Sequence, residues 1–133
     1  MLCVDGIEKI NLAMRKPRLI IVEGENLLIN VKRFFIIIGN EQEKRGNHAH
    51  KTLSQLLVCV HGICEVTVDD GENQKIFVLQ KPDEALLIPP GIWSKQTYLK
   101  PETTLLVACD ALYDESDYLR DYDIFLNYRR ENT

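Results

Sequence analysis

The feature that most restricts the possible folds of this chain is a regular succession of short apolar runs. From residue 17 onward, segments rich in Ile, Val, Leu and Phe recur about every eight to twelve positions, with turn residues between them. This rhythm is typical of an antiparallel sandwich or barrel, and it predicts an all-β domain. The predicted strands are Arg18–Val22, Leu27–Asn30, Lys32–Ile38, Gln55–Val60, Ile63–Val68, Lys75–Leu79, Glu84–Ile88, Trp93–Leu99 and Thr104–Cys109.

Two of these runs indicate how the strands are buried. In Cys64–Val68 polar and apolar residues alternate, which predicts a strand with one wet face, and Asp69-Asp70-Gly71 supplies the hairpin turn that follows. In Leu56–Val60 there is no alternation. We therefore expect that strand to be buried on both faces or to pack against a partner subunit.

The chain has 133 residues, which is enough for one domain and too few for two of ordinary size. We predict a single domain over the whole chain, with a barrel at about 17–111 and a tail at 112–133. Only the first sixteen residues and the tail look helical or irregular. In the tail, Asp114 or Ser116 is expected to cap a short helix, and the C-terminal residues are expected to fray.

Composition and charge exclude several classes of partner. A net charge of −4 and a pI near 5.4 disfavour a nucleic-acid-binding surface, which gathers Lys and Arg on one face. Apolar runs such as Phe34–Ile38 fall far short of the ~20 residues that a membrane-spanning helix needs, and the acidic start is unlike a secretory signal. We expect a cytoplasmic protein that binds neither nucleic acid nor membranes.

The four cysteines, Cys3, Cys59, Cys64 and Cys109, are expected to be structural. They lack the CxxC spacing of a zinc or redox site, and Cys59 and Cys109 lie inside apolar runs, where a thiol acts as a small core filler. A disulfide is not expected in a reducing compartment.

The segment with the most chemical content holds two of the three histidines, His48 and His50. On a strand, residues at i and i+2 share one face, so both imidazoles would point to the same side. Imidazoles inside a barrel need partners for their ring nitrogens. Three interpretations stay open on these residues alone: a solvated polar loop, a metal site, or metal-free acid–base chemistry by groups with an ordinary pKa of about 6.5.

A spaced set of residues accompanies the two histidines. Its members are His48, His50, Gln55 and Gly62 in one segment and Pro89, Gly91 and Ser94 in another. This set resembles the two motifs of the cupin superfamily, which implies a small jelly-roll β-barrel. Metal-binding cupins use two His, a Glu and a further His, whereas Gln55 and Ser94 occupy the last two positions here and are weak, neutral ligands. We therefore expect neither a metal nor another cofactor.

A more specific resemblance extends from about residue 18 to residue 128. It rests on Lys32-Arg33-Phe34-Phe35, Arg45-Gly46-x-His48-Ala49-His50-Lys51, Gln55, Val68-Asp69-Asp70-Gly71, Pro89-Pro90-x-Ile92-Trp93 and the acidic, tyrosine-rich tail from Tyr113 to Tyr122. Together these segments resemble the FdtA/QdtA/WxcM-like nucleotide-sugar 3,4-ketoisomerases, which are RmlC-like cupins. The resemblance implies an isomerase that moves the ketone of dTDP-4-keto-6-deoxyglucose from C4 to C3. It also implies a role on the way to a 3-amino or 3-acetamido sugar of a bacterial surface polysaccharide or a glycosylated product.

The residue types suit this reaction independently. Removal of the C3 proton, passage through an enediol and return of a proton at C4 need acid–base groups beside one sugar ring, and two imidazoles supply them. The resemblance assigns His48 as the C3 base and His50 as its partner at C4. The predicted substrate-binding residues are Arg33, Arg45 and Lys51 for the diphosphate, Trp93 for the sugar or the base, and Gln55 and Ser94 inside the barrel. The tail tyrosines are expected to pack against the barrel rather than to touch substrate.

Two departures from the family pattern keep other functions open. Phe35 and Ile36 stand where relatives commonly carry tyrosines, and Ser94 stands where they often have histidine. The main alternative is therefore a non-catalytic barrel that binds sugar nucleotides. A 3,5-epimerase and a metal-dependent cupin oxygenase are weaker alternatives.

A homodimer is also expected, and exchange of an N-terminal strand is one form that it can take. The runs Leu56–Val60 and Leu19–Val22 give a 15.3 kDa barrel more apolar strand surface than one small core readily covers. The expected ligand is a dTDP-linked 4-keto-6-deoxy sugar.

Overall fold

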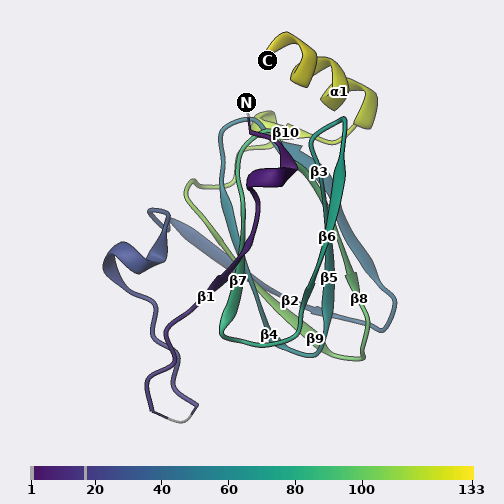
Figure 1. Cartoon of the computed structure of the whole chain (residues 1–133). Coiled ribbons are helices and arrows are strands. Elements are labelled where there is room, and N and C mark those ends of the chain that lie inside the picture. The colour runs from purple at the N-terminus through teal and green to yellow at the C-terminus, as the bar shows by residue number, and fades with distance from the viewer. Residues whose placement is uncertain (1, 17) are drawn as a thin grey trace.

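The computed structural model describes residues 2–16 and 18–133 and contains two five-stranded sheets that face each other (Figure 1). One sheet has the order β1 (Lys9–Asn11), β7 (Glu84–Ile88), β4 (Gln55–His61), β9 (Thr103–Cys109) and β2 (Arg33–Gly39). The other has the order β10 (Tyr118–Leu119), β3 (Lys44–His50), β8 (Trp93–Tyr98), β5 (Cys64–Asp69) and β6 (Gln74–Leu79). All the strand pairs are antiparallel, so the predicted all-β architecture is confirmed.

The apolar core lies between the two sheets. Along β8 and β9, buried residues alternate with more open ones, as expected when one face of a strand turns inward. Leu57, Val66, Leu86, Tyr98 and Leu105 are fully buried in this core. From β2 to β9, apart from β3, the predicted strands agree with the observed ones to within one residue at either end.

The strand without alternation, β4, is buried on both faces as predicted. Leu57 faces the core between the sheets, while Leu56 and Val58 are 5% and 8% exposed on the opposite face. That outer face is covered by Ile10 and other apolar residues of the N-terminal segment of the same chain. The apolar run in β4 is therefore accounted for without a partner subunit.

The N-terminal segment departs most from the prediction. The short strand β1 pairs with β7 in a stretch that was expected to be helical or irregular, after a 3₁₀ turn, η1 (Val4–Gly6). The predicted strand Arg18–Val22 is wrong, because only an isolated bridge between Met14 and Ile20 forms there. The barrel boundary predicted at residue 17 lies outside the described residues, and β1 joins the sheet before it.

The predicted strand Leu27–Asn30 is also wrong. A 3₁₀ turn, η2 (Gly24–Leu27), occupies its start, and Leu28 has a positive φ of 65°. A residue in the left-handed region cannot continue an extended strand, so the apolar run is broken at that point. Arg18, with φ of 71°, begins the other failed strand in the same way.

The histidine segment is a bulged strand. β3 pairs with β8, and its register shifts between Gly46 and His48, where Asn47 takes a positive φ of 60°. Gly46 also has positive φ, and a Cβ there would lie 2.9 Å from Oε1 of Gln96. A bulge re-aims the side chains beside it, and this one lies directly before His48.

The tail is more structured than predicted. The helix α1 (Tyr122–Glu131) is capped by Asp121, whose side chain accepts from the Ile124 amide, and not by Asp114 or Ser116. Asp114 instead caps a short 3₁₀ turn, η3 (Glu115–Asp117). The helix continues to Glu131, and the buried Arg129 ties its last turn to the barrel by donating to the Gly91 carbonyl at 2.8 Å.

The predicted hairpin after β5 is confirmed. The turn contains Gly71 with φ of 93°, and the Asp70 carboxylate accepts hydrogen bonds from the amides of Glu72 and Asn73. The amide of Val4 also donates to Asp70 at 2.9 Å, so this turn anchors the start of the chain. No helix within the described residues is long and apolar enough to cross a membrane.

Candidate active site

A cavity of about 390 Å³ opens between the two sheets. Its lining residues are Phe35 and Ile37 from β2, Arg45, Gly46 and His48 from β3, Gln55 from β4, Gln96 from β8, Val107 from β9, and Arg120 from the tail. The lining combines three apolar side chains with five polar or charged ones, and polar groups that converge in a cavity are typical of a small-molecule site. A hollow of about 490 Å³ beside α1 contains none of the predicted site residues. The cavity beside His48 is therefore the candidate active site.

The two histidines lie side by side on the inner face of β3. Their ring centroids are 5.0 Å apart and their planes are nearly perpendicular, at 83°. His48 lines the cavity, whereas His50 lies deeper and is 4% exposed. The spacing of two residues therefore places both rings on the same inner face, with His48 at the cavity and His50 buried behind it.

Both histidines are held in their uncharged form. Burial lowers the pKa of His48 below its ordinary value, and the backbone of Gly46 partly opposes this. For His50, burial and the neighbouring His48 lower the pKa to about 4, and the Asp117 carboxylate only partly compensates. At neutral pH each ring therefore has one nitrogen lone pair that can accept a proton.

The tail contributes a third ring to the histidine pair. β10 pairs with β3 so that Tyr118 lies opposite His50. The Tyr118 ring is 4.3 Å from the His50 ring and 5.1 Å from the His48 ring, centroid to centroid. We expected the tail tyrosines only to pack against the barrel, and Tyr122 does so beside Trp93. Tyr118 instead packs directly on the two histidines.

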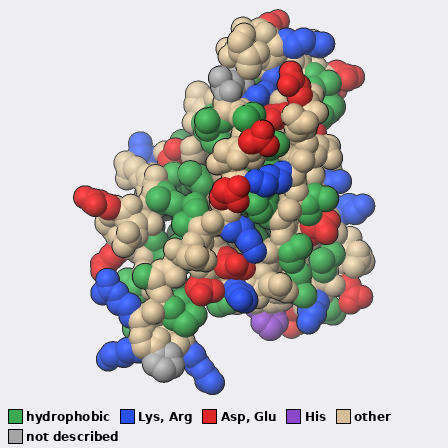
Figure 2. All heavy atoms as spheres, in the orientation of Figure 1, with side chains coloured by type: hydrophobic (Ala, Val, Ile, Leu, Met, Phe, Trp, Pro, Cys, Tyr) green, Lys and Arg blue, Asp and Glu red, His purple; other side chains and the backbone are tan. Residues whose placement is uncertain are grey.

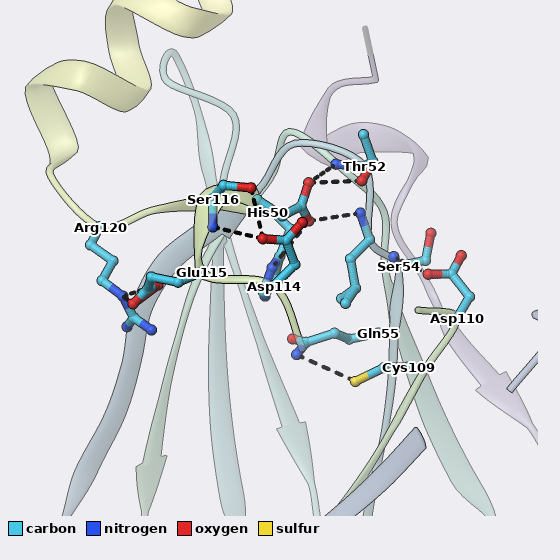
Figure 3. Close-up of polar contacts among 12 residues, drawn as sticks. His50, Thr52, Ser54, Gln55, Cys109, Asp110, Asp114, Glu115, Ser116 and Arg120 are labelled. Carbon is cyan, nitrogen blue, oxygen red and sulfur yellow. Dashed lines mark hydrogen bonds and ion pairs between the residues drawn. The ribbon is translucent and has the colours of Figure 1, made fainter. Parts of the chain in front are cut away.

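A carboxylate from the tail faces the buried histidine. Oδ2 of Asp117 lies 3.6 Å from Nδ1 of His50. Oδ1 accepts hydrogen bonds from the Thr52 amide at 2.9 Å and the Thr52 hydroxyl at 2.7 Å, and Oδ2 accepts from the Leu53 amide at 3.2 Å. Figure 3 shows His50 and Thr52 facing the loop that carries Asp114 and Glu115. The turn after β3 therefore fixes this carboxylate beside the imidazole.

Three guanidinium groups lie around the site. Arg45 lines the cavity and pairs with Glu43 at 2.9 Å, and Arg33 lies over the Phe35 ring at 5.0 Å. The third, Arg120, lines the cavity next to His48 and lies 4.2 Å above the Tyr118 ring. It also donates to the Glu115 carboxylate, which Figure 3 shows. These groups can hold a diphosphate.

Two predicted substrate contacts are placed elsewhere. Trp93 packs beneath α1, with ring centroids 5.2 Å from Tyr122 and 5.4 Å from Phe125, because Ser94 faces inward and strand alternation sends Trp93 outward. Lys51 is exposed in the turn after β3, where its amide donates to the Asp117 carbonyl, and it does not line the cavity. Neither residue therefore lines the cavity that holds His48.

The other predicted positions lie inside the barrel. Gln55 lines the cavity, and its amide points at the sulfur of Cys109 at 3.9 Å. Ser94 is buried, and its hydroxyl accepts a hydrogen bond of 3.5 Å from Gln96. Phe35 faces the cavity and Ile36 faces outward, so only the first of the two missing tyrosines is a change within the site.

The donor set around the histidines is a poor match for a transition metal. Two imidazoles are joined by a neutral amide and a neutral hydroxyl, from Gln55 and Ser94. Within residues 2–16 and 18–133, no group of three or more His, Cys, Asp or Glu side chains is arranged to hold a metal ion.

Comparison with known proteins identifies the family. The chain matches the family described as "FdtA: WxcM-like, C-terminal" over residues 5–130. It belongs to this family. A relative from Aneurinibacillus thermoaerophilus, named TDP-4-oxo-6-deoxy-alpha-D-glucose-3,4-oxoisomerase, is 37% identical over 109 residues, which cover 81% of this chain and 78% of the relative.

Solved structures agree with this assignment. A 3,4-ketoisomerase from Helicobacter canadensis is similar with a TM-score of 0.89 and 31% identity, over 94% of this chain and 98% of that one. QdtA, a sugar 3,4-ketoisomerase from Thermoanaerobacterium thermosaccharolyticum solved in complex with TDP, gives a TM-score of 0.90 and 27% identity over 98% of both chains.

The fold itself is wider than the family. The RmlC epimerase of Mycobacterium tuberculosis superimposes with a TM-score of 0.75 at 15% identity, over 89% of this chain and 70% of that one. The RmlC-like cupin barrel predicted from the motifs is therefore confirmed. At this identity the likeness supports the fold alone.

Proposed function

We propose that this chain is a TDP-sugar 3,4-ketoisomerase that converts dTDP-4-keto-6-deoxy-D-glucose to its 3-keto isomer through an enediol. The observation that carries the proposal is the pair of uncharged histidines beside the cavity, 5.0 Å apart, in a member of this family. Relatives named as 3,4-ketoisomerases share the fold over nearly the whole chain.

The reaction needs two proton movements and no external oxidant. In the first, His48 takes the C3 proton, the C3–H electrons form a C3=C4 double bond, and the His48 imidazolium protonates the C4 oxygen to give the enediol. In the second, His50 takes the proton of the C3 hydroxyl, and the resulting imidazolium delivers a proton to C4 as the C3 carbonyl forms. C3 is oxidised and C4 is reduced, so electrons stay within the sugar.

The placement of the two rings supports these roles. His48 lines the cavity, which suits a base that must reach C3. His50 is buried behind it and faces a carboxylate, which suits a group that becomes transiently charged during proton return. A neutral imidazole is the form that accepts a proton, and both rings are neutral at pH 7.

The nucleotide is proposed to extend from the cavity toward the arginines. Arg45 and Arg120 line the cavity, and Arg33 lies close enough to His50 to influence its charge. Guanidinium groups bind diphosphate oxygens with paired hydrogen bonds. A relative of the same fold was solved with TDP bound. The 3-keto product is suited to amination at C3, so we propose a place in the synthesis of 3-amino or 3-acetamido sugars.

The decisive test is an NMR assay with dTDP-4-keto-6-deoxyglucose, coupled to a 3-aminotransferase that traps the labile 3-keto sugar. A new C3-linked product supports the proposal. Binding of the nucleotide sugar without turnover would indicate the non-catalytic barrel instead, and solvent deuterium appearing at C5 would indicate epimerase chemistry. Either of those two results would overturn the ketoisomerase.

We further propose that the chain forms a homodimer through the outer face of β2. Phe34, Ile36 and Ile38 are 64%, 56% and 67% exposed there, side by side on one strand. Figure 1 shows the N-terminal arm around η2 reaching away from the barrel, and Figure 2 shows apolar side chains among the surface atoms beside it. A contiguous apolar surface of this kind marks an interaction site, and exchange of the arm between copies would cover more of it.

Light scattering at micromolar concentration tests the dimer. A dimeric mass for the native chain and a monomeric mass for Ile36→Glu are expected, because the charge would have to be buried at the interface. A monomeric mass for the native chain would refute the proposal.

A further inference from the structure

The side chain of Asp117, in the tail, is held in place by several hydrogen bonds. Its two carboxylate oxygens accept three hydrogen bonds from Thr52 and Leu53, all in the turn that follows β3. Its backbone carbonyl accepts a further bond from the amide of Lys51. The carboxylate therefore has one orientation, and in that orientation Oδ2 points at Nδ1 of His50 from 3.6 Å.

We propose that Asp117 is a positioning residue for His50, which keeps a proton on Nδ1 and leaves Nε2 as the nitrogen that exchanges protons with the substrate. This inference rests on the proposed ketoisomerase activity and deepens it. A carboxylate only accepts hydrogen bonds, so the imidazole nitrogen facing it must be the one that carries the proton. Neither ring nitrogen of His50 has a hydrogen-bond partner within 3.5 Å among the described residues, but only Nδ1 faces a carboxylate oxygen, at 3.6 Å.

The charges around His50 explain why a carboxylate is needed there. The groups that act on this imidazole are His48 on its own strand, Asp117 and Arg120 on the tail, and Arg33 on β2. The two arginines and a protonated His48 all disfavour a second positive charge. Among the groups that act on His50, Asp117 alone favours its charged form. When His50 takes the proton of the C3 hydroxyl, the carboxylate stabilises the imidazolium that results.

The present distance fits such a role. At 3.6 Å the contact is longer than the ~2.8 Å of a charge-assisted hydrogen bond, and catalytic hydrogen bonds commonly tighten only when substrate is bound. The Tyr118 ring, 4.3 Å from His50, limits sideways movement of the imidazole. His50 is therefore held in place while its charge changes.

The test replaces Asp117 with Asn, which keeps the shape of the side chain. If the Asn oxygen continues to accept from Thr52, its amide nitrogen faces Nδ1 of His50 and donates to it, so the imidazole proton moves to Nε2. We expect ¹⁵N NMR of the histidine ring to show this change of tautomer. We expect kcat to fall about 10²-fold or more with little change in KM, by analogy with other histidines that lose an orienting carboxylate.

Two control variants separate this role from a structural one. Asp114→Asn removes a carboxylate from the same loop, where it caps η3 through Ser116, and should leave the tautomer and kcat unchanged. Thr52→Val removes one of the three donors to Asp117 and keeps the charge. It should preserve the Nδ1–H tautomer and lower kcat less than Asp117→Asn does.

The outcomes distinguish this inference from the proposed function. Solvent deuterium should still enter C3 in Asp117→Asn, because His48 is intact, while net isomerisation is lost. An unchanged His50 tautomer, or wild-type kcat in a folded Asp117→Asn protein, would overturn the positioning role while leaving the isomerase in place. Absence of isomerisation by the native enzyme would instead overturn the function itself.

Discussion

The candidate site is shared by a long strand and a very short one, β3 and β10, which are neighbours in the same sheet. β3 is hydrogen-bonded on both sides, to β8 and to β10, and its backbone fixes both histidines. β10 has two residues and meets β3 only at His50 and Ala49. Its hold on the barrel comes mainly from side chains, with Leu119 and Phe125 buried in a small cluster against Ala49.

This difference suggests that β3 and the tail have different roles in the site. The strand with the fuller hydrogen-bond ladder carries the two histidines that we propose exchange protons, and such groups need positions accurate to a fraction of an ångström. The tail carries Asp117 and Tyr118, which lie against His50, and Arg120, which lines the cavity, and we propose that these residues orient the histidines and set the charge around them. Loss of a β3 histidine should therefore stop the reaction, whereas changes in the tail should alter rate or affinity without abolishing folding.

The largest effect is expected from His48→Asn. Removal of a general base typically costs 10²–10⁴-fold in rate, and Asn keeps polarity and approximate volume without a titratable nitrogen. Turnover should nearly vanish while TDP affinity and the barrel are retained. Solvent deuterium exchange at C3, followed by NMR, should be lost with it. Exchange at the wild-type rate would show that His48 is not the C3 base.

The sequence predicts the β3 side of the site far better than the tail side. His48 and His50 are found because a spacing of two on a strand fixes a shared face, and that depends only on local geometry. Asp117 and Arg120 reach the site through the pairing of β10 with β3, a contact between residues more than sixty positions apart. The acidic, tyrosine-rich tail identified the family without indicating which of its side chains turn inward.

The errors in the fold have a similar physical origin. Arg18–Val22 and Leu27–Asn30 have the composition of strands, but positive φ values at Arg18 and Leu28 break them, and no propensity scale shows where a non-glycine residue will take that conformation. Trp93 and Ser94 are both predicted to contact substrate, but neighbours on a strand face opposite ways, and the structure turns Ser94 inward.

The second prediction concerns acid stability and depends on His50. Its pKa is about 4 in the folded protein and 6.5 when exposed, so between those pH values the unfolded chain binds a proton that the folded chain does not. Stability should therefore fall as the pH drops from 6.5 toward 4, by up to about 3 kcal/mol from this residue. Chemical denaturation across this range should show a shallower loss for His50→Gln.

His61 provides the matched control for that experiment. It is exposed at the end of β4, so His61→Gln removes the same ring from a position open to water. This variant should keep the steep acid slope of the native protein. An equal slope in His50→Gln and the native protein would contradict the assigned environment of His50.

The third prediction compares cationic groups on the two sides of the site: Arg45 in β3, and Arg120 directly after β10. Arg45→Ala and Arg120→Ala should each weaken TDP binding by about 1.5–3 kcal/mol, the usual scale for a hydrogen bond to a charged group. Lys51→Ala should have no such effect, because Lys51 does not line the cavity. Calorimetry with TDP measures all three. Unchanged TDP affinity in Arg120→Ala would place the diphosphate away from the tail side of the cavity.

The smallest effect is expected from Trp93→Phe, which tests whether the outer face of the second sheet is separate from the site. Trp93, at the start of β8, is half-buried against Tyr122 and Phe125 of α1, and its side chain points away from the barrel interior. A smaller ring there should reduce the free energy of unfolding by about 1 kcal/mol, because part of the apolar contact with the helix is lost. TDP affinity and KM should stay at their native values, since the neighbouring Ser94 is the residue that faces inward. Thermal unfolding and calorimetry on the same sample provide both measurements. A loss of TDP affinity with unchanged stability would mean that the nucleotide reaches across the sheet to the helix side, and that the tail binds substrate on two faces.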